Sequence, residues 1–136
     1  MKLRNIEDTM VGALGIELFD NEDGTFSAAM MVDSRTCQIY GYLNGGASLA
    51  LAENLAGFAS FKSCTNGDVP LGISVTANHV ASAMCGQKVF AKATALQKGH
   101  HLHIWDIDIR DENKKLLSNI RVTNMIVNRR NIKDTE

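Results

Sequence analysis

A single acidic side chain among small residues is the first candidate for chemistry. The segment Gly41 to Asn54 reads GYLNGGASLALAEN, and Glu53 is its one charged residue. On a helix, the neighbours of Glu53 at i−4, i+3 and i+4 are Leu49, Ala56 and Gly57, and none can pair with its charge. Burying an unpaired carboxylate costs free energy, so it takes up a proton or finds a partner. Glu53 is therefore a candidate base or nucleophile; alternatively, it reaches the surface or forms a buried ion pair.

Two glycines at the expected start of the same helix offer a second kind of chemistry. Asn44 is a favourable N-cap residue, and Gly45 and Gly46 follow it. Helix N-termini carry unpaired N–H groups and partial positive charge, and glycines let a ligand atom approach them closely. This arrangement can hold a developing oxyanion. The alternative is that the glycines only ease close packing at a sharp turn.

The distance between these two features predicts a dimer. Glu53 lies eight residues after Gly45, which is about 12 Å along a helix axis. One Gly45 and its own Glu53 cannot easily act on the same carbonyl. A second copy of the helix, antiparallel across a dimer axis, could bring them together. Function then requires a homodimer.

The element that carries these residues is a long helix from Gly45 to about Lys62. Its first four turns are nearly uncharged and rich in Gly, Ala and Ser, unlike an amphipathic surface helix. Small residues allow close approach of neighbouring backbone, so we expect a sheet to surround it on most sides; packing on one partner alone is the other possibility.

The remaining chain alternates between strand-like runs and turns. A short helix is expected at Ile6 to Leu14. The expected strands are Gly15–Phe19, Thr25–Val32, Leu71–Ala81, Lys88–Gln97, His101–Arg110 and Leu116–Val127. In the third of these, Ile73, Val75, Ala77 and His79 share one face. The order predicts an α+β fold with six mostly antiparallel strands and one long central helix.

Composition limits the class of protein. The chain has 136 residues, 45% of them apolar and 21% charged, with a net charge of −1, which fits one soluble domain. The absence of a basic stripe argues against nucleic acid as a partner. The first residues do not form a signal peptide, and no apolar run is long enough to cross a membrane. Cys37, Cys64 and Cys85 lack zinc-site spacing and are expected as free thiols in the cytoplasm.

Three segments of the chain match a known pattern. They are Gln38-x-x-Gly41-x-x-Asn44-Gly45-Gly46-Ala47 followed by Glu53, and the weaker signatures Ala77-Asn78-His79-Val80 and Gly99-x-x-x-x-x-Trp105. The first resembles the active-site segment of hotdog-fold acyl-CoA thioesterases. It is most similar to the Arthrobacter-type 4-hydroxybenzoyl-CoA thioesterase group. The resemblance runs from about residue 8 to 127, which it implies as the core of one hotdog domain. That group includes the 1,4-dihydroxy-2-naphthoyl-CoA hydrolases of menaquinone synthesis and the proofreading thioesterase of enterobactin synthesis.

The resemblance implies an architecture and a mechanism. The fold is an antiparallel sheet curled around the long helix, in dimers with a continuous sheet and often in tetramers of two dimers. The carboxylate at Glu53 acts as nucleophile or general base, the N–H of Gly45 polarises the thioester oxygen, and Gln38 orients the substrate. These groups come from both subunits. No metal or redox cofactor is implied, because coenzyme A is part of the substrate.

Two positions depart from the family pattern. Asn44 stands where the family usually has His; it keeps a donor and the N-cap function but cannot titrate. We expect it to position rather than protonate. Gly57 stands where relatives often carry Ser or Thr, so a hydroxyl that could hold a water or the carboxylate is missing.

The remaining site residues are expected to contact the substrate. They are Gly46, Gly57, Phe58, His79, Ser82, Lys98, His100 and His101, the last three near the phosphates of coenzyme A. His79 could instead be a core histidine, and Phe58 a core or interface aromatic. His101 and His103 share a strand face, but no third ligand set suggests a metal. Cys37 is interpreted as a packing residue rather than a nucleophile.

The predicted function is hydrolysis of an acyl- or aryl-CoA thioester, with 1,4-dihydroxy-2-naphthoyl-CoA as the first candidate. A broad housekeeping thioesterase is one alternative. A non-catalytic acyl-CoA-binding domain, with the Asn44 change having removed turnover, is another. A dehydratase of the same fold is less favoured because the His–Asp or His–Glu pair it needs is absent.

Overall fold

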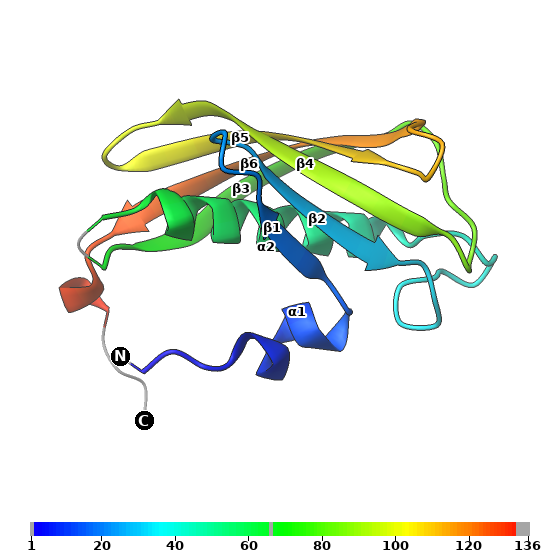
Figure 1. The fold of residues 1–136 in the computed structure, drawn as a ribbon, viewed down its shortest axis with the longest axis horizontal. Helices are drawn as coiled ribbons and strands as arrows, with labels where there is room; N and C mark the ends of the chain where they lie inside the picture. The colour runs from blue at the N-terminus through cyan, green and yellow to red at the C-terminus, as the bar shows by residue number, and fades with distance from the viewer. Residues whose placement is uncertain (1, 66, 133–136) are drawn as a thin grey trace.

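One sheet and one long helix dominate the structure. The computed structural model describes residues 2–65 and 67–132. The sheet is antiparallel, with strand order β1-β2-β4-β5-β6-β3, and it arches over the 19-residue helix α2 (Gly45–Ser63) (Figure 1). The strands are β1 (Glu17–Asp20), β2 (Phe26–Met31), β3 (Val69–His79), β4 (Lys88–Lys98), β5 (Leu102–Arg110) and β6 (Leu116–Val127). This is the hotdog arrangement, so the predicted fold class is confirmed.

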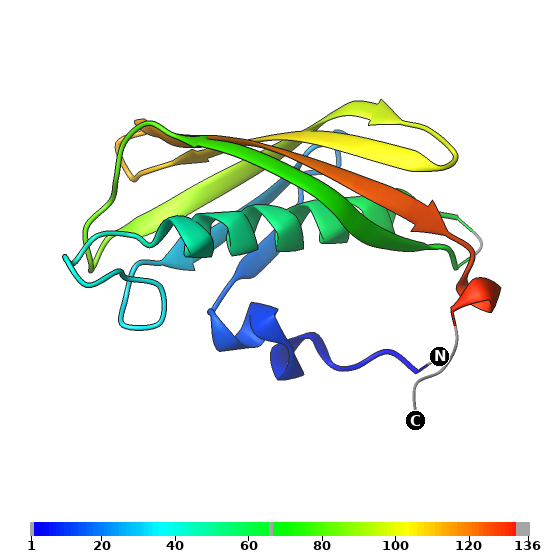
Figure 2. The ribbon, with the colours of Figure 1, turned by 180° about the vertical axis from the view of Figure 1, so that it is seen from behind.

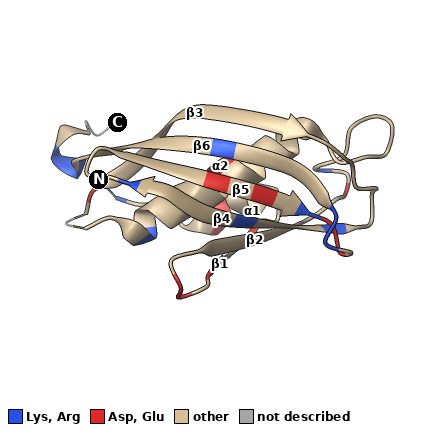
Figure 3. Cartoon of the chain, turned by 90° about the horizontal axis from the view of Figure 1, so that it is seen from above, with Lys and Arg blue, Asp and Glu red and all other residues tan. Residues whose placement is uncertain are grey.

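Alternation along the strands builds the core. In β5, the residues His103, Trp105, Ile107 and Ile109 are buried and alternate with less buried ones, as the period of two requires. The other face of the sheet is polar: Lys92 of β4 lies opposite Asp108 of β5, and Asp106 of β5 lies opposite Arg121 of β6. Figure 3 shows these oppositely charged positions side by side across the three strands. One face of the sheet is therefore apolar and packs on α2, and the other faces out.

Helix α2 begins and ends within one residue of the prediction, but the sheet covers only one side of it. Eight residues face the sheet and are buried: Ala47, Ser48, Leu51, Ala52, Leu55, Ala56, Ala59 and Ser60. A second stripe, which runs from Gly46 through Glu53 to Phe61, is not buried. Figure 2 shows the N-terminal segment beneath α2, on the side away from the sheet. The small residues thus serve close packing on one face, and the other face stays open within one chain.

The predicted helix from Ile6 to Leu14 is broken in two. A 3-10 turn, η1 (Ile6–Asp8), precedes the short helix α1 (Met10–Ala13). Thr9 separates them, since its backbone is extended and its side-chain oxygen accepts a hydrogen bond from the N–H of Val11. A threonine that caps the next turn interrupts the preceding one. A second short 3-10 turn, η2 (Arg129–Asn131), follows β6.

Strand β3 contains an irregularity that changes which side chains point inward. The pairing with β6 shifts between Gly72 and Ser74, so Ile73 is the extra residue of a bulge and is 55% exposed. Val75 and Ala77 pack against the core as predicted, but Ile73 does not join them. The strict alternation assumed from the sequence fails at this bulge.

Among the described residues, no helix is both long and apolar enough to cross a membrane.

Candidate active site

The start of α2 leaves one backbone N–H available. The side chain of Asn44 accepts a hydrogen bond from the N–H of Gly46 at 2.8 Å, and its carbonyl accepts from the N–H of Ala47 at 2.9 Å. The predicted N-cap is therefore confirmed. Within the described part of the chain, the N–H of Gly45 has no acceptor. This N–H can donate a hydrogen bond to an oxyanion.

His79 lies beside this helix start. A Cβ placed on Gly45 would lie 3.1 Å from Nε2 of His79, so glycine leaves the room that the imidazole ring occupies. On the other side of the ring, Nδ1 of His79 lies 2.7 Å from Oγ of Ser118. Gly45, His79, Ser82 and Ser118 line one small cavity of about 190 Å³. His79 is thus neither a core histidine nor remote from Gly45.

Ser118 is a site residue that the sequence analysis missed. It lies on β6 directly opposite His79 of β3. Opposite residues in an antiparallel pair have neighbouring side chains, so correct strand pairing could have revealed it.

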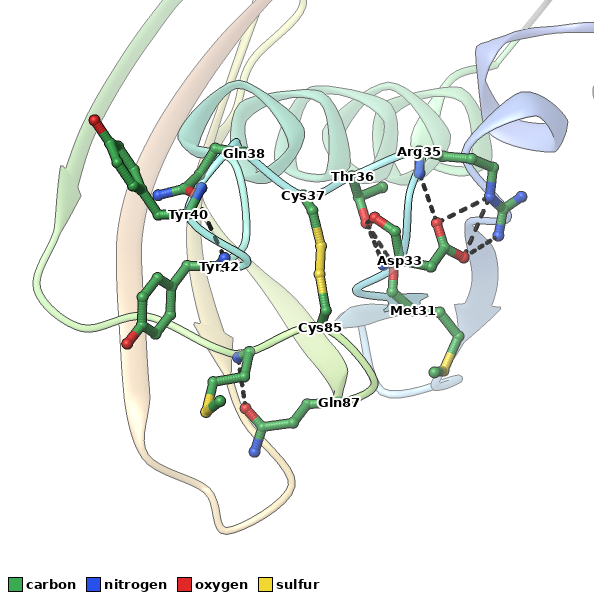
Figure 4. The surroundings of a disulfide bond; sticks show 11 residues. Met31, Asp33, Arg35, Thr36, Cys37, Gln38, Tyr40, Tyr42, Cys85 and Gln87 are labelled. Atoms are coloured by element: carbon green, nitrogen blue, oxygen red, sulfur yellow. Dashed lines mark hydrogen bonds and ion pairs between the residues drawn. A yellow bond between two sulfur atoms is a disulfide. The ribbon is translucent and has the colours of Figure 1, made fainter.

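The loop that carries Gln38 is tied to a second loop by a disulfide bond. Cys37 and Cys85 are bonded, with 6.5 Å between their Cα atoms (Figure 4). The prediction of free thiols is therefore wrong for both, and Cys37 is not simply a packing residue. The two cysteines are 48 residues apart in sequence, and a spacing of this length does not indicate pairing. Cys64 alone remains free.

Gln38 itself shapes the turn that leads to the helix. Its side-chain oxygen accepts hydrogen bonds from the backbone N–H groups of Tyr40 and Tyr42 (Figure 4). Ile39 and Tyr40 at the tip of this turn are 90% and 77% exposed. The amide nitrogen of Gln38 is left as the end that could meet a substrate.

Glu53 lines an open groove rather than a buried site. It lies on the uncovered stripe of α2 and is exposed in the single chain, which agrees with the alternative that it reaches the surface. Strand β3 approaches Glu53 at Gly72, and the N-terminal segment lies on the other side of a groove of about 880 Å³. No ion pair within residues 2–65 and 67–132 involves Glu53, so the alternative of a structural ion pair is not supported. Gly57 and Phe58 line the same groove.

Gly72 is a second residue that the sequence analysis missed. A Cβ on Gly72 would lie 4.0 Å from Oε2 of Glu53 and 3.6 Å from Oδ1 of Asn124. The carboxylate therefore sits over bare backbone at the β3 bulge. A Cβ at position 72 would therefore make ordinary van der Waals contact with both oxygens. A glycine at an irregular point of a strand was the available signal.

The expected nucleotide contacts lie at the other end of the molecule. Lys98 and His100 lie at the connection between β4 and β5, where with Cys64 and Asp68 they line a hollow of about 410 Å³ near the end of α2. His101 is exposed in the same connection. Helix α2 is 19 residues long, so this end lies about 27 Å from Gly45 in one chain.

His103 also lines this hollow, but unlike the surface histidines it is buried. It is 5% exposed, and its Nδ1 lies 2.9 Å from Oγ of Ser60 in the core. No group of three His, Cys, Asp or Glu side chains suited to a metal ion occurs in the part of the chain that the structure describes.

The site residues thus form three groups in one chain. Asn44, Gly45, His79 and Ser82 lie at the start of α2, Glu53 with Gly57 and Phe58 in the groove, and Lys98 with His100 and His101 at the far end. The geometry brings each group together but separates them by the length of the helix. A site that uses all three needs a second chain.

Comparisons with known proteins show which family the chain belongs to. Residues 40–118 match the family model described as "Thioesterase superfamily". The chain is 40% identical over 122 residues to the 1,4-dihydroxy-2-naphthoyl-CoA hydrolase of Escherichia coli, covering 89% of this chain and 88% of that one. It is 34% identical to the proofreading thioesterase EntH of Cronobacter turicensis, covering 88% and 86%. A thioesterase structure from Haemophilus influenzae superimposes with a TM-score of 0.86 at 36% identity, covering 90% of this chain and 85% of that one. The chain therefore belongs to the thioesterase superfamily, and it is a thioester hydrolase.

Proposed function

We propose that the protein hydrolyses an aryl-CoA thioester to the free acid and coenzyme A. Glu53 either adds to the carbonyl carbon itself or takes a proton from the attacking water. The N–H of Gly45 binds the oxyanion that forms. The carbon–sulfur bond then breaks, and the thiolate leaves and takes up a proton. In the general-base route, the attacking water supplies the new oxygen of the acid. In the nucleophilic route, water then cleaves the anhydride between the acyl group and Glu53, which releases the acid and restores the carboxylate. One observation carries this proposal. Among the described residues, the Glu53 carboxylate forms no ion pair, and the Gly45 N–H at the start of the same helix has no acceptor.

A homodimer completes the proposed site. In one chain, Gly45 and Glu53 are separated by about 12 Å of helix axis, too far to act on one carbonyl. Strand β3 lies at an edge of the sheet and exposes Leu71 and Ile73, which supports pairing with a second β3. Antiparallel pairing places one chain's Gly45 near its partner's Glu53. Two such dimers forming a tetramer are part of the proposal.

The relatives' names suggest the acyl group and a second candidate. The E. coli relative acts on 1,4-dihydroxy-2-naphthoyl-CoA, which is our first candidate substrate. The EntH relative is named a proofreading thioesterase, which favours a broad clearing role as the second candidate. In either case, Lys98, His100 and His101 of one chain are proposed to meet the nucleotide of coenzyme A, and Gln38 with Asn44 to position the thioester.

The proposed compartment is the cytoplasm. Disulfides in that compartment are mainly transient or redox-sensing, so the Cys37–Cys85 bond is expected to be reversible there. The chemistry of the site needs no metal or redox cofactor.

Removal of the Glu53 carboxylate tests the mechanism. Release of thiol from a panel of acyl- and aryl-CoA thioesters is measured for the parent and for Glu53→Ala. We expect kcat to fall at least ~10²-fold, the usual size of a base or nucleophile effect. Glu17→Ala is the matched control, because Glu17 pairs with Lys88 at the surface, away from the groove. Parent-like activity in Glu53→Ala would refute the mechanism, and binding without turnover in the parent would indicate a non-catalytic domain.

A further inference from the structure

One histidine at the start of α2 can exchange a proton with a substrate. Of the seven described residues that line the small cavity beside Gly45, His79 is the only one whose side chain gains and loses a proton near neutral pH. Asn44, which caps the helix, carries an amide that cannot titrate. The proposed hydrolysis needs Glu53 and Gly45, but it also needs a donor for the proton that the departing thiolate takes up.

The ring of His79 lies within reach of a thioester bound at Gly45. Nε2 of His79 is 3.1 Å from the position that a Cβ on Gly45 would take. Covalent geometry puts that position about 2.5 Å from the nitrogen of Gly45, so Nε2 lies at most about 5.6 Å from this nitrogen. A thioester oxygen that accepts the N–H lies about 2.9 Å from the nitrogen, and the sulfur is bonded to the same carbon as that oxygen. The sulfur can therefore contact Nε2 while the oxygen keeps its hydrogen bond to Gly45.

Ser118 holds the ring so that Nε2 is its free end. Nδ1 of His79 lies 2.7 Å from Oγ of Ser118, a buried residue directly opposite His79 in the pairing of β3 with β6. A buried hydroxyl needs a hydrogen-bond partner, so this contact fixes the orientation of the ring. When the ring is protonated, Nδ1–H donates to Oγ and Nε2–H faces Gly45, and loss of the Nε2 proton leaves the bond to Ser118 intact. His79 is exposed in the single chain, so a substrate can reach it.

We propose that His79 is the general acid of the reaction and gives its Nε2 proton to the sulfur as the carbon–sulfur bond breaks. This inference rests on the proposed function and names the source of the thiol's proton. The electron pair of the broken bond stays on sulfur, the thiol forms, and the ring becomes neutral. The ring then regains, through solvent, the proton that water loses during hydrolysis. Gly45 and His79 belong to one chain, so this role is the same whichever surface joins two copies.

The test changes the leaving group and keeps the acyl group. Benzoyl-CoA releases an alkyl thiol, whereas S-(4-nitrophenyl) thiobenzoate releases an aromatic thiolate that leaves without taking up a proton. We expect His79→Gln to lower kcat/KM for benzoyl-CoA about 10²-fold, the lower end of general-acid effects, and for the aromatic ester by no more than about threefold. Glu53→Ala should lower both, because attack on the carbonyl precedes departure of sulfur. Thr76→Ala, exposed on the opposite face of β3, is the control and should match the parent on both esters.

Added imidazole separates the proton from the shape of the side chain. His79→Ala removes the ring, and imidazole in solution should restore much of the lost turnover of benzoyl-CoA and leave that of the aromatic ester unchanged. Ser118→Ala removes the hydroxyl that orients the ring, so it should lower turnover of benzoyl-CoA less than His79→Gln does. Circular dichroism verifies that each variant is folded.

The outcomes separate this inference from the function on which it rests. Equal losses on both esters in His79→Gln would indicate a donor to the oxyanion, and would overturn the general-acid role while leaving the hydrolase intact. Parent-like turnover of benzoyl-CoA in His79→Gln, or no rescue of His79→Ala by imidazole, would overturn it as well. A parent that hydrolyses neither ester overturns the proposed function, and the role of His79 with it.

Discussion

Individual residues determine the chemistry of this site, and some of them are glycines that leave space where a side chain would otherwise lie. Gly45 leaves room for the ring of His79, and Gly57 leaves open space in the groove beside Glu53. The sequence predicted Gly45 because it follows an N-cap residue, but Gly72 could not be predicted without knowing that Glu53 packs over β3. The sequence left the exposure of Glu53 open for a related reason: periodicity shows which residues share a helix face, not which face a sheet covers.

A buried serine fixes the protonation of His103. Oγ of Ser60 accepts hydrogen bonds from Nε1 of Trp105 and Nδ2 of Asn124, which uses both of its lone pairs. Its one proton is therefore donated to Nδ1 of His103. Protonation of that nitrogen would break the network. Burial and, after it, the charge of Lys98 accordingly lower the pKa of His103 below its ordinary value.

This arrangement predicts a pH dependence of stability. In the unfolded chain His103 takes up its proton near its ordinary pKa of about 6.5, whereas the folded protein takes it up only at lower pH. The unfolded state binds more protons in that window, so the free energy of unfolding falls as pH drops below about 6.5. Urea unfolding at pH 7.5 and 5.5 measures the fall. It should be smaller in His103→Asn, and an equal fall in both proteins would contradict the assignment.

At the scale of elements, the sequence predicts the regular helix and strands but not the irregular features that interrupt or link them. The strands and α2 were found within a few residues, because alternation and helical spacing are properties of short windows. The β3 bulge, the break at Thr9 and the Cys37–Cys85 bond were missed, because each depends on contacts between segments far apart or on one exceptional residue. The position of the disulfide bond matters, since it holds the Gln38 loop next to the start of α2.

Reduction of the Cys37–Cys85 bond should loosen the loop that precedes α2 in the sequence. A cross-link across 48 residues stabilises a fold by roughly 2–4 kcal/mol, mainly by restricting the unfolded chain. We expect dithiothreitol to lower the urea midpoint of the parent and to leave the Cys37→Ser/Cys85→Ser double variant unchanged. Cys64→Ser is the matched control; burial and nearby Asp68 raise the pKa of the Cys64 thiol, which disfavours the reactive thiolate. A parent with the same midpoint with and without reductant would count against a stabilising bond.

At the scale of the whole molecule, one chain holds the parts of the site but cannot bring them together on one substrate. The helix start and the carboxylate lie on one rigid element, so no loop movement within the chain can bring them together. The sequence predicted this separation correctly, because helix length depends only on residue count. It could not predict which surface joins two copies, since the exposed edge of β3 becomes evident only when the strand order is known.

The β3 edge should therefore control both assembly and activity. Ile73 is exposed at the bulge, so Ile73→Glu removes no buried contact within one chain and should leave the folded monomer intact by circular dichroism. Paired β3 strands would bring two such glutamates near each other at a dry edge, and their repulsion and desolvation should shift the protein toward monomer. Sedimentation velocity measures that shift, and thioester hydrolysis should fall with the dimer fraction. Phe19→Glu, on exposed strand β1 at the opposite edge of the sheet, is the control. Full activity in a monomeric Ile73→Glu would show that one chain suffices, and the two-subunit site would have to be abandoned.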